Sequence, residues 1–185
     1  MKKTCIALLF CFVSLFSCKN NGENTSKENE TNVEEIKKED FFKVQLNLKV
    51  LKNDNLHLYY TEDGSINFNE KQSIWTEVKG SSEFQTVSFN FPKDAIPTAI
   101  RLDLGYGKNA EQSDVELGSI EMSYFGKNFK AQGAEIFNYF YPTAESSTRL
   151  AGTNTLKRID KNQPGAPILY PNENLSKKIS EIVKK

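Results

Sequence analysis

The chain has 185 residues, in which 24 lysine and arginine side chains balance 24 aspartates and glutamates. A chain with no net positive charge and no basic stripe lacks the electrostatic footprint of a nucleic-acid-binding protein, so no nucleic-acid partner is expected. Cys5 and Cys11 lie in an apolar N-terminal run that is expected to be removed, so Cys18 and one histidine leave too few ligands for a zinc or iron site, and we expect neither a metal nor another cofactor.

The N-terminal segment predicts export and a lipid anchor. Two lysines precede an apolar run from Ile6 to Phe16, which fits a signal-peptide core of about 7–15 residues and is shorter than the roughly 20 that a membrane-spanning helix needs. The sequence LFSC that ends at Cys18 resembles the lipobox of bacterial lipoproteins. In that family the cysteine sulfur carries diacylglycerol, the chain is cut before the cysteine, and the new amine is acylated, for instance with palmitate. Phe16 departs from the pattern, where a smaller residue is usual, and an ordinary signal peptide cut near Ser17 is the alternative.

Residues 1–17 are therefore interpreted as a lipoprotein signal peptide and Cys18 as the lipidated residue. Each buried methylene of a lipid contributes about 0.8 kcal/mol, and a protein with two or more chains stays on the membrane. Lys19 follows the cysteine, and no aspartate stands there to resemble the inner-membrane retention signal. We expect a lipid-anchored protein of the cell envelope, on the outer membrane, facing the periplasm or the cell surface.

Residues 18–40 are predicted to form the lipidated cysteine and a disordered tether. Only Val33 and Ile36 among them could be buried after the cysteine, so the segment cannot offset the entropy that ordering costs. A flexible chain of this length reaches roughly 25 Å. The tether would hold the folded part close to the lipid surface.

From Phe41 onward apolar and polar residues alternate. The segments with this period of two are short, and turn residues separate them: residues 42–50, 56–60, 87–91, 100–104 and 120–124. Such strands without intervening amphipathic helices predict an all-β fold, an antiparallel β-sandwich or jelly roll. The first two segments are expected to pair as a hairpin. The connection over residues 65–82 shows no sustained period and is predicted to be irregular.

The remainder of the chain predicts an extension of the sandwich that ends in a short helix. Three prolines between residues 164 and 171 favour an extended passage. Helical spacing of apolar residues over 172–185 predicts the C-terminal helix, with Asn174 or Ser176 as its N-cap. Residues 41–185 are accordingly expected to form one β-sandwich domain with a C-terminal extension.

The order of the motifs LYYT, a glutamate-containing loop, FNFP and RLDLG resembles a small β-sandwich domain of bacterial envelope proteins and lipoproteins, also found as an accessory piece of some membrane glycosyltransferases. The plan is similar to that of the galactose-binding-like jelly rolls that serve as carbohydrate-binding modules. The resemblance covers residues 41–185 and implies a fold. It implies no catalytic activity, and a shared sandwich does not by itself establish a shared function.

Polar residues on one predicted strand are the first candidates for a site. Arg101 and Asp103 share a face and could form a polar site with His57 or Glu121. The alternative is an exposed ion pair, which contributes at most about 1 kcal/mol. His57, on the solvent side of its strand, is expected to be a surface residue.

Aromatic residues are the second group of candidates, because flat rings are platforms for sugars. Trp75 and Tyr59 are predicted to stack on a glycan while polar neighbours such as Gln45 form hydrogen bonds with its hydroxyls. Alternatively, Trp75 lies in a loop and covers the core of the sandwich. The predicted ligand-binding residues are Trp75, Tyr59, Arg101, Asp103, Asn47 and His57.

Two hypotheses about function follow. The first is a non-catalytic binding module that holds a glycan or a partner envelope protein. The alternative is a hydrolase of envelope polysaccharide that uses Asp103 and Glu121 as its carboxylate pair. The single histidine and the lack of a catalytic motif favour binding. Oxygen-rich loop segments around Asp63 and residues 53–55 match no defined calcium site.

Overall fold

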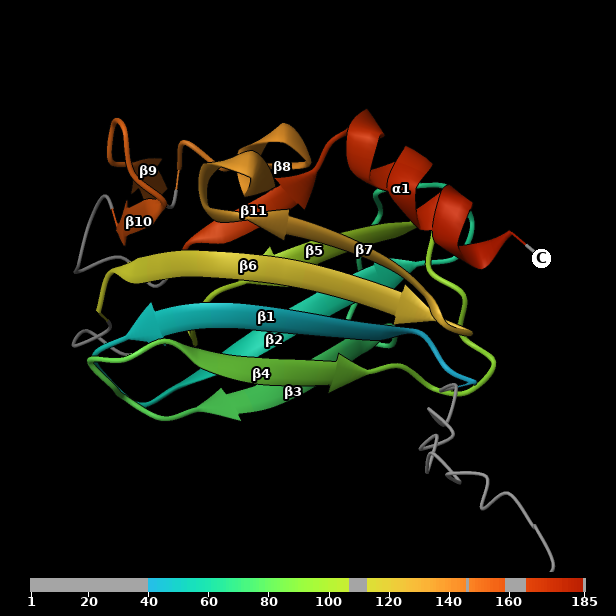
Figure 1. The fold of residues 1–185 in the computed structure, drawn as a ribbon, viewed down its shortest axis with the longest axis horizontal. Helices are drawn as coiled ribbons and strands as arrows, with labels where there is room; N and C mark the ends of the chain where they lie inside the picture. Colours follow the sequence, from blue (N-terminus) through green and yellow to red (C-terminus); the bar gives the residue numbers. More distant parts are fainter. Residues whose placement is uncertain (1–39, 107–112, 146, 159–165, 185) are drawn as a thin grey trace, which may run out of the picture. The chain divides into compact units, whose positions relative to one another are not determined.

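The computed structural model describes residues 40–106, 113–145, 147–158 and 166–184 (Figure 1). Within these ranges two antiparallel sheets pack against each other, and a short helix follows near the C-terminus. The predicted all-β sandwich with a C-terminal helix is thereby confirmed. The signal peptide 1–17, Cys18 and the tether up to residue 39 lie outside the described residues.

The first sheet has the strand order β4-β1-β6-β10-β9, and β7 pairs with the same edge of β6 as β10 does. Its apolar side chains alternate inward; in β1, for example, Val44, Leu46 and Leu48 are fully buried. The strands are β1 (Lys43–Val50), β4 (Gln85–Asn90), β6 (Val115–Tyr124), β7 (Lys127–Gln132), β9 (Ser147–Arg149) and β10 (Thr155–Arg158).

The second sheet has the order β3-β2-β5-β11-β8. Its inner face completes the core with buried side chains such as Leu56, Leu58 and Leu102, and the same alternation turns the residues between them to the outer face. The strands are β2 (Asp54–Thr61), β3 (Ser73–Val78), β5 (Ala99–Asp103), β8 (Phe140–Pro142) and β11 (Ile168–Pro171).

Two expectations about strands are wrong. The first two strands do not form a hairpin: β1 pairs with β4 and β6, whereas β2 pairs with β3 and β5 in the other sheet. β1 and β2 each have one apolar face. The chain crosses from the first sheet to the second after Val50, so both apolar faces point into the core. The segment predicted to be irregular contains β3, whose Ile74 and Val78 face inward while Trp75 and Glu77 face outward. The alternation of β3 is short, with only Ile74 and Val78 as inward apolar residues, and its pairing with β2 orders the segment.

Helix α1 (Glu173–Val183) covers one side of the sandwich, where it contacts strands of both sheets. Leu175, Ile179 and Ile182 are buried against the core. The N-cap is Asn172, whose side-chain oxygen accepts hydrogen bonds from the backbone of Asn174 and Leu175, so the helix was expected at the right place but with the wrong cap. A 3₁₀ helix, η1 (Gly133–Asn138), links β7 to β8. The described helices include none that is long and apolar enough to cross a bilayer.

Candidate functional site

The outer side of the second sheet carries a cluster of aromatic and charged side chains. Strand register places His57 between Trp75 on β3 and Asp103 on β5, and it places Tyr59 beside Arg101. Because neighbouring strands keep these residues on the solvent side of the pleat, their side chains meet across three strands. We call the following residues the aromatic face: His57, Tyr59, Trp75, Arg101, Asp103 and Tyr170.

The indole of Trp75 covers the imidazole of His57. The two rings stack with centroids 3.7 Å apart at an angle of 16°, and the centroid of the Tyr59 ring lies 3.9 Å from that of the imidazole. His57 is consequently only 2% exposed, although Trp75 itself remains 46% exposed. The expectation of a surface histidine is wrong, because two neighbouring rings shield it. Trp75 belongs to strand β3 and the outer face, not to a loop over the core.

Glu70, in the loop that leads into β3, fixes the orientation of both large rings. Its carboxylate accepts a hydrogen bond from the Trp75 Nε1 at 3.1 Å and another from the Tyr59 hydroxyl at 3.1 Å. The bond from Trp75 is the main cause that lowers the pKa of Glu70; desolvation opposes it, and the bond from Tyr59 adds to the lowering. Burial and the bond to Glu70 raise the pKa of Tyr59 to about 12. No pattern in the sequence distinguishes Glu70 from the other acids of its loop.

The surroundings of His57 favour the neutral form of its imidazole. Burial lowers its pKa, and the nearby carboxylates of Glu70 and Asp103 oppose that effect without overcoming it. The Nε2 atom lies 3.7 Å from Glu70 Oε1, and it has no hydrogen-bond partner among the described residues. The imidazole therefore serves the aromatic face as a flat support beneath Trp75.

Arg101 and Asp103 form a bidentate ion pair. Arg101 donates from Nε to Asp103 Oδ1 at 2.7 Å and from Nη2 to Oδ2 at 2.5 Å, and it also donates to the Tyr170 hydroxyl at 3.3 Å. Its guanidinium lies 4.6 Å from the ring centre of Tyr59 and 5.2 Å from that of Tyr170. The two charged side chains are only 18% and 15% exposed. The expected alternative of an exposed pair is thus wrong, because two tyrosine rings flank the guanidinium.

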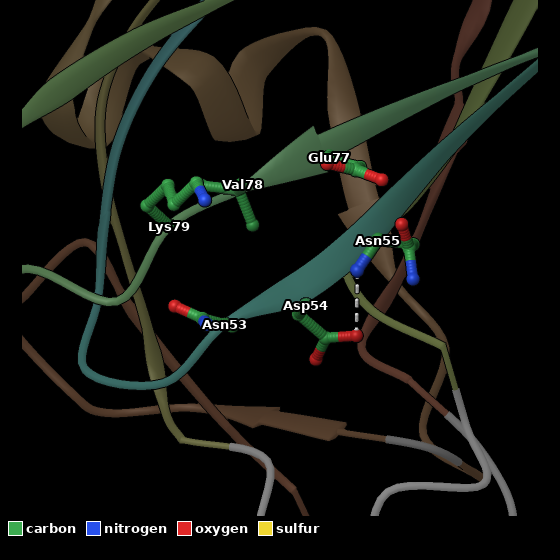
Figure 2. A pocket seen from close by; sticks show the side chains of 6 residues that line it. All are labelled: Asn53, Asp54, Asn55, Glu77, Val78 and Lys79. Carbon is green, nitrogen blue, oxygen red and sulfur yellow. Dashed lines mark hydrogen bonds between the residues drawn. The ribbon is translucent and has the colours of Figure 1, made fainter.

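A polar hollow of about 260 Å³ adjoins the aromatic face (Figure 2). Asn55 and Glu77 form the register pair next to His57 and Trp75 on the same outer face, and Figure 2 shows both at one side of the hollow. The hollow is lined by Asn53, Asp54, Asn55, Glu77, Val78 and Lys79.

Tyr106 links the hollow to the aromatic face. Asp54 Oδ1 accepts hydrogen bonds from the backbone of Asn55 at 2.8 Å and of Tyr106 at 2.7 Å. The ring of Tyr106 packs edge-on against Trp75, 5.7 Å between centroids. The aromatic face and the hollow therefore form one continuous surface, with a flat apolar part and a polar part.

Three residues expected near this surface lie elsewhere, and one of them, Gln45, is on β1 in the first sheet opposite Ser88. Asn47 is on β1 in the first sheet, where its side chain donates to Thr86 at 3.1 Å. Glu121 is on β6 of the same sheet and pairs with Lys130 at 3.6 Å. The predicted carboxylate pair is thus split between the outer sides of two sheets, and Asp103 is occupied by Arg101. Within the described ranges no three metal-ligating side chains gather at one point.

The fold and the surface define an all-β antiparallel sandwich with an aromatic outer face. A scan against protein-family models, a search of curated proteins and a search of solved structures each gave no match. A function for the chain has to be inferred from the chemistry of its surface.

Proposed function

We propose that the chain is a lipid-anchored protein of the cell envelope that binds glycan on its aromatic face without catalysing a reaction. The observation that carries the proposal is Trp75, a half-exposed indole whose inner side rests on His57 and whose Nε1 is tied to Glu70. Trp75 is 46% exposed, so part of the indole stays open to a ligand beside the edge-on ring of Tyr106.

A sugar ring combines an apolar face of C–H groups with a rim of hydroxyls. A flat aromatic ring can stack on the C–H face, and polar side chains nearby can form hydrogen bonds with the hydroxyls. Trp75 offers the flat ring, and Asn55 and Glu77 offer amide and carboxylate groups one register step away. Because Glu70 and His57 already fix the indole, little side-chain entropy is lost when a ligand stacks on it.

The lipid anchor rests on the signal-like segment and Cys18. A chain lipidated there would stay on a membrane, in keeping with the expectation of an outer-membrane lipoprotein. Intact-mass spectrometry of the natural protein tests this part: the mature chain should begin at Cys18 and carry the mass of a diacylglycerol and a further acyl group. A chain that begins elsewhere without added mass would contradict it.

Glycan-array binding of residues 18–185 with Cys18→Ser tests the binding part. This range contains all the described strands and α1. We expect binding to at least one glycan and, for Trp75→Ala, a loss of about tenfold or more, since burial of a large aromatic surface is removed. Phe84→Ala is the matched control, because Phe84 is 44% exposed and precedes β4 in the other sheet.

The proposal is overturned if no glycan on the array binds, or if Trp75→Ala binds as well as the parent. Co-purification of the natural protein from membranes would then reveal the alternative, a partner envelope protein bound to the same chain.

A further inference from the structure

The hairpin between β6 and β7 exposes an apolar side chain where turn chemistry favours a polar one. Tyr124 pairs with Lys127, so Phe125 and Gly126 form a two-residue loop, with φ of 48° and 80°. Positive φ at both positions is the pattern of a type I′ turn, in which Asn, Asp or Gly is favoured at the first position. Phenylalanine is disfavoured there by backbone sterics. Phe125 is nevertheless 52% exposed, so burial in the core does not explain it.

An apolar hollow of about 380 Å³ lies beside this turn. Tyr124, Phe125 and the last turn of α1 supply its apolar walls, and Lys127 and Lys184 stand among its lining residues. The Lys127 ammonium donates to the backbone carbonyl of Lys184, which ties the hairpin to the end of the helix. We call Tyr124, Phe125, Lys127, Ile182, Val183 and Lys184 the hairpin tip.

The preceding chain joins the sandwich at the same end. Lys43 at the start of β1 is opposite Ser123, and the ring of Phe42 lies 6.3 Å from that of Tyr124. The eight residues of β1 then run away from this end over about 26 Å. Val50, at the far end of β1, is opposite Val115. A membrane anchor that precedes residue 40 is therefore attached next to the hairpin tip and away from the opposite end.

We propose that the hairpin tip docks on an anionic lipid bilayer. Phe125 and the apolar side chains around the hollow would insert at the boundary between headgroups and acyl chains. The ammonium groups of Lys127 and Lys184 would stay with the anionic headgroups. The occupant is a bilayer because the lipid-proximal end of the chain, an exposed aromatic ring and two lysines coincide there. The choice of a bilayer as the occupant rests on the proposed lipid anchor. The contact itself uses no residue of the aromatic face, so it goes beyond the proposed glycan binding.

Co-sedimentation with vesicles tests the proposal, again with residues 18–185 carrying Cys18→Ser, which contains both sheets and the helix and lacks the apolar signal segment. The vesicles contain phosphatidylethanolamine and phosphatidylglycerol at about three to one. We expect the parent to bind and Phe125→Asn to bind about tenfold more weakly, because one aromatic side chain is withdrawn from the lipid. Asparagine suits a type I′ turn, so this variant keeps the hairpin.

Phe84→Asn is the matched control, because Phe84 is 44% exposed and lies near Lys49 at the opposite end of β1. Its vesicle binding should equal that of the parent. The proposal fails if the parent does not sediment with the vesicles, if both variants bind alike, or if neutral phosphatidylcholine vesicles bind as strongly. It also fails if sedimentation equilibrium shows a parent dimer that Phe125→Asn dissociates, since the tip would then be an interface between two copies.

Discussion

The ion pair between Arg101 and Asp103 should contribute far more to stability than a surface pair does. Arg101→Met keeps the length and the apolar stem of the side chain but removes both bonds to the carboxylate at 2.7 and 2.5 Å. Asp103, which is 15% exposed in the pair, would then lack its cation. Tyr59 and Tyr170, which flank the guanidinium, would still pack against the methionine.

The magnitude follows from the burial of the pair. Breaking a fully buried pair costs roughly 3–5 kcal/mol, whereas an exposed pair contributes about 0–1 kcal/mol. Side chains that are 18% and 15% exposed lie between these limits, so Arg101→Met should lower the free energy of unfolding by about 2 kcal/mol. The double variant with Asp103→Asn should lose less than the sum of the two single losses, by about 1–2 kcal/mol.

Urea unfolding of the four proteins in this cycle measures the effect. The midpoint should shift while the denaturant slope stays constant, so that the change reports stability alone. Losses that add within about 0.3–0.5 kcal/mol would show that the two residues act independently. The description of Arg101 and Asp103 as one buried unit would then be wrong.

Three further predictions concern His57 and the backbone. Burial lowers the pKa of His57 from its ordinary 6.5, so the unfolded chain binds more protons than the native one near that pH. The free energy of unfolding should therefore fall as the pH drops from about 7.5 to 5. Urea titrations at several pH values should show a flatter slope for His57→Phe. Gly80→Ala would place a Cβ 2.7 Å from the Leu51 carbonyl oxygen and should lower the free energy of unfolding by about 2 kcal/mol. The loss should exceed that of Gly64→Ala, whose Cβ meets no atom within 4 Å and adds only φ strain. Equal urea midpoints for the two variants would contradict the clash. Asn172→Ala removes the cap of α1 and should lower the melting temperature through a loss of about 1 kcal/mol, whereas an unchanged melting temperature would refute the assigned cap.

The fold class could be predicted because burial of one strand face produces a local pattern of alternating apolar and polar residues. In β1 each buried residue alternates with a polar one, and β5 does the same from Ile100 onward, so the strands and their inward faces can be read from the sequence. No local sequence pattern shows which strands pair with each other. β1 and β2 are adjacent in the chain with facing apolar sides, a pattern that fits a hairpin as well as it fits two sheets, and only the long-range partners β4, β5 and β6 decide between them.

Part of the candidate site could be predicted for the same reason. Alternation indicates that Arg101 and Asp103 share the solvent side of β5, and that Tyr59 faces outward from β2. It does not indicate which sheet a strand joins, so it places Asn47 with them although Asn47 lies in the other sheet. The burial of His57 depends on the rings of Trp75 and Tyr59 packing against it, and the role of Glu70 depends on the path of a loop. Neither has a local signal in the sequence.

The indole N–H resonance of Trp75 tests the central claim most directly, because the chain contains one tryptophan. A glycan selected on the array is titrated into ¹⁵N-labelled residues 18–185 carrying Cys18→Ser. The account predicts that the Trp75 indole signal and the amide signals of neighbouring β2 and β3 residues shift together and saturate at one affinity. Saturable binding that leaves the Trp75 signal unmoved and shifts amides of the first sheet instead would contradict it.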